Sequence, residues 1–156
     1  MIKYILIMNE QYRELLFIDL CGRLPYKVRM FEIEPINDIQ SNLTLQSITN
    51  KESVICITPS GGVIGSSIDA FKPYLFPLSS MTEEQKKELD EKFYVIRICW
   101  NNIRIRYHSQ GYWDTDLEVD FQDWLWLIDW FNKNHFDYRG LIEKGLAIDA
   151  SGLNIY

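Results

Sequence analysis

The stretch Tyr94–Asp120, YVIRICWNNIRIRYHSQGYWDTDLEVD, predicts a β-hairpin followed at once by an acidic alternating segment. Both halves of 94–108 are rich in β-branched and aromatic residues, and Asn101-Asn102 lies between them. Asparagine tolerates the positive φ that a two-residue hairpin turn demands. We therefore expect a tight turn at Asn101-Asn102, and the position of this turn sets the pairing of the two strands.

The expected register divides the hairpin into an apolar face and a basic face, because side chains alternate along a strand. It pairs Cys99 with Arg104, and it places Arg97 directly opposite Arg106. Like charges that face each other are destabilising unless another group neutralises them. With aromatic rings nearby, the basic face is a candidate site for phosphate or single-stranded nucleic acid. It consists of Arg97, Arg104, Arg106 and His108.

Acidic residues recur at every second position after the hairpin. The alternation resembles the start of a calcium loop, but Val119 stands where the loop needs Gly and Leu125 where it needs a bidentate Glu. We therefore expect no metal site. A returning strand would place the acids across from Arg104 and Arg106, where each opposite-charge pair contributes about 0.2–1 kcal/mol. This acidic strip consists of Asp114, Asp116, Glu118 and Asp120.

Upstream of the hairpin, the sequence predicts one helix and an antiparallel meander. Asn9 is a suitable N-cap for a helix over 10–21, and Gly22 is a plausible stop. Phe71–Leu78 contains two prolines and is expected to be an extended linker laid across the core. Strand patterns are found at 26–33, 43–48, 53–58 and 63–68.

Downstream of the linker, the pattern indicates helices. Ser80-Met81-Thr82-Glu83 matches a capping box that opens a charged helix to about residue 92. A Trp-rich helix is predicted over 121–134, ended by His135, and a short helix near 138–144. The apolar stripe of the Trp-rich helix contains Phe121, Trp124, Leu125, Ile128 and Phe131.

Trp126 and Trp130 lie partly off that apolar stripe. A helix that is apolar around much of its circumference must be deeply buried or must face a partner. We therefore expect Trp126 and Trp130 to be exposed aromatic residues that bind a partner, either another protein or a second copy of the chain.

Length and composition favour a single α+β domain over residues 1–156, with possible sub-parts 1–70 and 80–156. We expect a small antiparallel sheet, formed by the meander and the 94–108 hairpin, packed with three to four helices. The net charge of −6 argues against attraction of the whole protein to nucleic acid or anionic membrane. Three widely spaced cysteines and the lack of a long apolar run favour the cytoplasm.

Three further stretches carry a family resemblance: LCGRLPYKV at 20–28, KPYLFPLSSMTEEQKKE at 72–88 and HFDYRGLIEKGLAI at 135–148. In this order they resemble a group of small uncharacterised proteins of anaerobic gut bacteria, their phages and their mobile elements. The resemblance implies a cytoplasmic accessory protein, and it implies no activity, cofactor or catalytic residue.

The residues themselves offer no convincing set for catalysis. Cys99 and His108 would lie about 13 Å apart on the hairpin, too far for a nucleophile and its base. The Gly-rich stretch 60–67 lacks the Lys of a phosphate loop. We therefore expect no cofactor and favour a non-catalytic interaction protein over an enzyme, with nucleic-acid or phosphate binding as the alternative.

Overall fold

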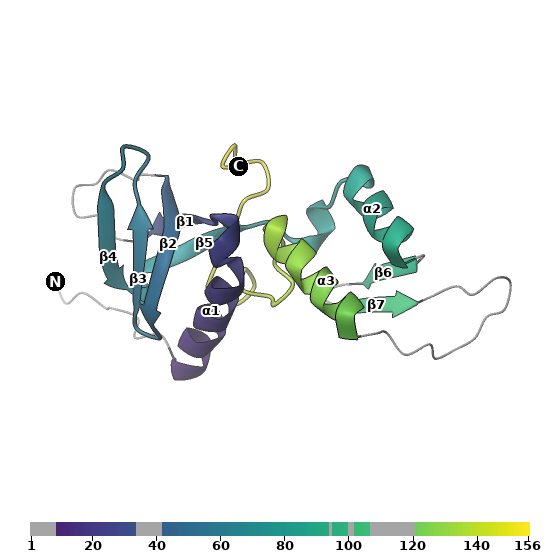
Figure 1. Cartoon of the computed structure of the whole chain (residues 1–156), viewed down its shortest axis with the longest axis horizontal. Coiled ribbons are helices and arrows are strands. Elements are labelled where there is room, and N and C mark those ends of the chain that lie inside the picture. The colour runs from purple at the N-terminus through teal and green to yellow at the C-terminus, as the bar shows by residue number, and fades with distance from the viewer. Residues whose placement is uncertain (1–8, 34–41, 94, 100–101, 107–120) are drawn as a thin grey trace, which may run out of the picture.

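The computed structural model describes residues 9–33, 42–93, 95–99, 102–106 and 121–156. For Phe93 and for the two strands between 95 and 106 it describes the backbone alone. The α+β class is confirmed: a six-stranded sheet covered by α1 stands beside α2, α3 and a two-stranded sheet (Figure 1). The two parts meet where α1 contacts α3.

Helix α1 (Glu10–Arg23) begins as predicted, because the Asn9 side chain accepts a hydrogen bond from Gln11 N at 2.8 Å. The predicted stop at Gly22 is wrong. The helix continues to Arg23 and passes into the short 3₁₀ helix Leu24–Tyr26. Gly22 has a packing role instead, since a Cβ at this position would lie 3.0 Å from Nδ2 of Asn132 in α3.

The meander is confirmed and forms one edge of the main sheet. Its strands lie side by side in the order β4-β3-β2-β1, and each neighbouring pair is antiparallel. Helix α1 packs on this sheet through Leu16 and Leu20, which are fully buried. The strands are β1 (Arg29–Glu32), β2 (Leu43–Asn50), β3 (Ser53–Ile57) and β4 (Val63–Ser67).

The expected linker over 71–78 is in fact largely a strand. β5 (Phe71–Leu75) pairs antiparallel with β1, and its residues alternate between buried and half-buried. Two prolines are typical of a linker, but Pro73 is buried within this strand. On its other side β5 pairs in parallel with β8 (Ile148–Asp149), so the segment after 146 packs back on the sheet.

Helix α2 (Glu83–Phe93) has a capping box, but two residues later than predicted. Thr82 Oγ1 accepts from Gln85 N at 3.2 Å, and Gln85 Oε1 accepts from Thr82 N at 2.9 Å. Ser80 lies in the 3₁₀ helix Leu78–Ser80, where its hydroxyl donates to Pro77 O at 2.7 Å. Both tetrapeptides match the capping pattern, and the preceding 3₁₀ turn decides between them.

The predicted hairpin exists, but its register is wrong and it is separate from the main sheet. β6 (Val95–Cys99) and β7 (Asn102–Arg106) form a two-stranded sheet in which Cys99 pairs with Asn102 and Arg97 with Arg104. Asn102 is a strand residue, so the Asn-Asn pair is not the turn. Arg97 is therefore opposite Arg104 instead of Arg106.

Helix α3 (Phe121–Lys133) matches its predicted range to within a residue. The short helix expected near 138–144 is replaced by a series of turns, with Gly140 and Gly145 at positive φ. The Asp137 carboxylate holds these turns, since it accepts hydrogen bonds from Leu141 N and Ile142 N at 2.8 Å each.

The buried apolar residues form two clusters. The larger lies between α1 and the main sheet, and it extends to Leu141 and Leu146 in the turns that follow α3. The second lies beneath α3, and α2 contributes Leu89 to it. Its fully or nearly buried members are Leu78, Met81, Leu89, Leu127, Trp130, Phe131 and Phe136.

Candidate functional site

Helix α3 carries apolar side chains on two neighbouring sides. One side is buried: Leu127, Trp130 and Phe131 are between 1 % and 5 % exposed. The other side is open, and its residues follow the i, i+3, i+4, i+7 spacing of a single helical face. We call this face the α3 stripe, and it consists of Phe121 (69 % exposed), Trp124 (38 %), Leu125 (44 %) and Ile128 (37 %).

The sequence-based orientation of this helix is therefore wrong for most of its length. Four of the five residues predicted to face the core are exposed, and only Phe131 is buried. The expectation that Trp130 is exposed is wrong. Its ring stacks on Phe136 at 5.7 Å between centroids and meets Phe131 edge-on at 5.6 Å. The aromatic residues after α3 thus select which side of the helix is buried.

Trp126, the other predicted partner-binding residue, is half-buried. Its ring stacks on Trp130 at 6.4 Å, and the Lys92 ammonium lies 5.7 Å from the ring centroid. Lys92 also forms an ion pair with Asp123 at 3.3 Å. These contacts place Trp126 at the contact between α2 and α3.

The α3 stripe lies on a helix that is anchored at its far end. The Tyr26 hydroxyl donates to the Asp129 carboxylate, and this hydrogen bond raises the pKa of Tyr26. One turn further on, Asn132 is buried against Gly22 of α1 and accepts from the Tyr138 hydroxyl at 3.1 Å. The stripe is therefore presented by a fixed element.

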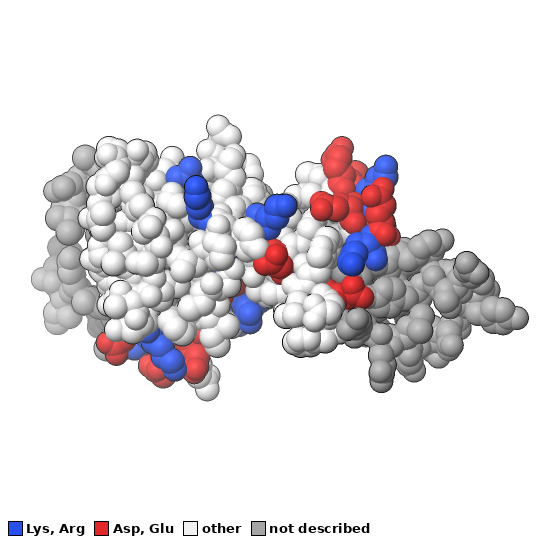
Figure 2. Space-filling model, viewed as in Figure 1, with Lys and Arg blue, Asp and Glu red and all other residues white. Residues whose placement is uncertain are grey.

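On the face of the molecule in Figure 2, the charged residues gather mainly on elements other than α3. Figure 2 shows a mainly uncharged surface over α3, with charged residues gathered over α2 and around the foot of α1. A contiguous set of exposed apolar side chains is typical of a protein-binding surface.

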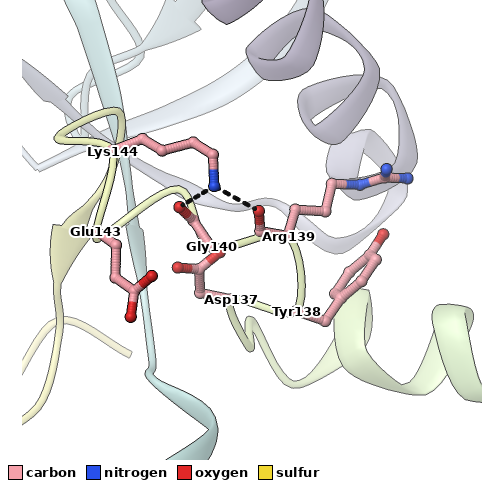
Figure 3. Close-up of a pocket in the computed structure, with 6 residues that line it drawn as sticks. All are labelled: Asp137, Tyr138, Arg139, Gly140, Glu143 and Lys144. Atoms are coloured by element: carbon pink, nitrogen blue, oxygen red, sulfur yellow. Dashed lines mark hydrogen bonds between the residues drawn. The ribbon is translucent and has the colours of Figure 1, made fainter. Parts of the chain in front are cut away.

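A hollow of about 310 Å³ lies beside the turns after α3 (Figure 3). Its charged side chains hold the turns themselves. Lys144 Nζ donates to Gly140 O at 3.1 Å, the Asp137 carboxylate caps two backbone amides, and Arg139 points away toward α1. The hollow is lined by Asp137, Tyr138, Arg139, Gly140, Glu143 and Lys144, and we assign it no ligand.

His135 ends α3 as predicted, but its imidazole does not act as a cation at the helix terminus. Burial and the neighbouring Arg23 and Arg29 lower the pKa of His135 to about 4, so the ring is neutral at pH 7. The ring stacks on Tyr156 with centroids 3.9 Å apart. The sequence offered no signal for this contact, which joins residues far apart in the chain.

The structure describes part of the predicted basic face, and the acidic strip lies outside the described residues. Arg97, Arg104 and Arg106 are described by their backbone, which places Arg97 opposite Arg104. His108 and the strip at Asp114, Asp116, Glu118 and Asp120 lie outside the described residues. Their pairing therefore stays a prediction.

Within the described part of the chain, no three His, Cys, Asp or Glu side chains gather in a way that could hold a metal ion. Cys56 is fully buried, as expected of a core residue, and burial raises the pKa of its thiol to about 12. A thiol with so high a pKa is a poor nucleophile.

Comparison with known proteins finds no matching family model, no matching curated protein and no matching solved structure. Among the helices that the structure describes, none combines the length and apolar character that crossing a bilayer requires.

Proposed function

We propose that this protein is a non-catalytic interaction protein that binds another protein, or a second copy of itself, through the α3 stripe. The observation that supports this is the exposure of four apolar side chains on one helical face, with Phe121 the most exposed. Fully burying an exposed Phe, Leu or Ile side chain contributes about 1.5–3 kcal/mol, and each residue of the stripe can contribute the part of this that its remaining exposed surface provides. Four apolar anchors on one face therefore suit helix-in-groove recognition or helix pairing.

The architecture supports a binding role for the helix. The buried side of α3 is fixed by Leu127, Trp130 and Phe131, so the stripe needs no rearrangement to meet a partner. A preformed surface saves the ordering cost that a flexible segment pays on binding. The binding surface would then lie on the face of α3 adjacent to Trp126 and Trp130 and would not include these two residues.

The test is Leu125→Glu, which places a charge in the middle of the stripe. Sedimentation velocity over a range of concentrations reports self-association, and pulldown from a native lysate reports a different partner. We expect Leu125→Glu to lose the complex while circular dichroism shows an intact fold. Lys133→Glu, at an exposed position on the same helix outside the stripe, is the matched control and should keep it.

Nucleic-acid or phosphate binding by Arg97, Arg104 and Arg106 stays the alternative proposal. It is distinguished by its salt dependence, because phosphate contacts release counterions and weaken steeply as salt rises. A gel shift at low salt that is lost in Arg97→Glu/Arg104→Glu and kept in Leu125→Glu would favour this alternative over the α3 stripe.

A further inference from the structure

The side chain of Tyr156 lies in a socket built from separate segments of the chain. Its ring stacks on the imidazole of His135 at 3.9 Å and meets Phe76 at 5.7 Å between centroids. Its hydroxyl accepts a hydrogen bond from Arg29 N at 3.1 Å and donates one to Tyr74 O at 2.7 Å. The socket thus contacts both the apolar ring and the polar end of a phenol.

The polar end of the socket belongs to the main sheet. β1 and β5 pair Met30 with Pro73, and the next residues in this register are Arg29 and Tyr74. At this position the Tyr156 hydroxyl bridges the amide of one strand and the carbonyl of the other. Phenylalanine would leave both groups without this partner, so the socket distinguishes tyrosine from phenylalanine.

The walls of the socket are held by their own backbone contacts. Phe76 N donates to His135 O at 2.9 Å, and Asp137 N donates to Phe76 O at 2.8 Å. His135 has a left-handed φ of 58°, fixed by hydrogen bonds from Phe136 N to Phe131 O and from His135 N to Asn132 O. This is the Schellman geometry at a helix C-terminus. None of these contacts involves Tyr156.

The segment that carries Tyr156 is held far less firmly. Residues 151–154 are exposed, and the backbone amides of Leu153 and Ile155 donate locally, to Ala150 O and Leu153 O. Tyr156 itself is 44 % exposed, so its socket opens at the surface. A preformed socket with a loosely tethered occupant is suited to exchange of that occupant.

We propose that this socket is a binding site for tyrosine side chains, which Tyr156 fills within the chain and which a tyrosine of another polypeptide fills when Tyr156 leaves. The recognition chemistry is an aromatic ring of the right size plus a hydroxyl that both donates and accepts. The site is separate from the α3 stripe, and neither proposal depends on the other.

The test replaces the occupant by a small phenol in the full-length chain. Tyr156→Gly should lower the thermal midpoint by several degrees, and p-cresol at ~10 mM should raise the midpoint of this variant more than that of the wild type. Toluene, which has the ring without the hydroxyl, should recover less. Equal shifts in both proteins, or equal effects of toluene and p-cresol, would overturn the proposal.

A second measurement applies even if Tyr156→Gly does not fold. Tyr156→Phe keeps the ring and removes only the hydroxyl. We expect the amide of Arg29 to exchange with solvent at least ~10-fold faster in Tyr156→Phe, while the amide of Val54 in the buried centre of the sheet is unchanged. An unchanged rate at Arg29 would show that the hydroxyl does not hold this amide, and the socket would then have no means to select tyrosine.

Discussion

Asp19 and Arg23 form a completely buried ion pair one turn apart on α1, with Nε 2.6 Å from Oδ2 and Nη2 3.0 Å from Oδ1. Arg23 Nη2 also donates to Phe136 O at 2.8 Å, so the pair ties α1 to the chain that follows α3. The Tyr138 ring lies 5.5 Å from the Arg23 guanidinium and 5.0 Å from that of Arg139. This buried network connects the two parts of the molecule.

Replacing both members of this pair should cost less stability than the two single replacements added together. Asp19→Leu leaves the buried Arg23 without a carboxylate, and Arg23→Met leaves Asp19 with only Arg139, whose Nε lies 3.5 Å from Oδ1. Removing one partner of a buried ion pair costs about 3–5 kcal/mol. The double variant removes both charges and should be destabilised by clearly less than the sum of the single effects. Urea unfolding of the four proteins measures this coupling, and simple additivity would show that the two charges do not depend on each other.

The sequence predicted those elements whose signals are local. The Asn9 cap, the meander and the bounds of α3 each depend on a few neighbouring residues, and each was confirmed. The opposite charges of Asp19 and Arg23 at i, i+4 spacing were also visible, but on a helix this pattern ordinarily indicates a surface pair. Burial of the pair depends on Phe136, more than a hundred residues away.

The orientation of α3 shows why the candidate site could not be predicted fully. The helix is apolar on both sides, so its periodicity fits either side facing the core. The decision comes from partners outside the helix: Phe136, Leu78, Met81 and Leu89 contact the side that carries Trp130. The prediction of a linker over 71–78 was wrong for a similar reason. The pairing of Phe71–Leu75 with β1 makes this segment a strand despite its two prolines.

Stability should fall as the pH falls from about 6.5 to about 4. Burial, with Arg23 and Arg29, lowers the pKa of His135 to about 4, so the unfolded chain binds a proton at higher pH than the folded chain does. His135 therefore lowers the unfolding free energy by up to ~1.4 kcal/mol per pH unit in this window. Above pH 6.5 its contribution is constant.

The variant His135→Asn separates this effect from the titration of carboxylates. Asparagine tolerates the left-handed φ of 58° at this position and does not titrate. The slope of unfolding free energy against pH should therefore be shallower in His135→Asn between pH 4 and 6.5. Identical slopes in the two proteins would contradict a lowered pKa for His135.

The start of α2 should depend on Thr82. Thr82→Ala removes the side-chain oxygen that accepts from Gln85 N and should cost about 1 kcal/mol. Thr82→Ser keeps the hydroxyl and is the matched control, which should lose no stability because serine is at least as good an N-cap as threonine. Urea unfolding measures both, and an equal loss in the two variants would show that the cap hydrogen bond does not stabilise the helix.

The effect of Gly22→Ala should change sign with the residue at 132. Alanine favours a helix over glycine by about 0.5–1 kcal/mol, but its Cβ would lie 3.0 Å from the Asn132 amide. Asn132 is 3 % exposed and its oxygen is held by the Tyr138 hydroxyl, so it has little room to move. Gly22→Ala should therefore destabilise the wild type, and it should stabilise an Asn132→Ala background in which the amide is gone. Urea unfolding measures the effect of Gly22→Ala in the wild type and in the Asn132→Ala background. A stabilising effect in both backgrounds would show that the close approach of α1 and α3 does not require glycine at position 22.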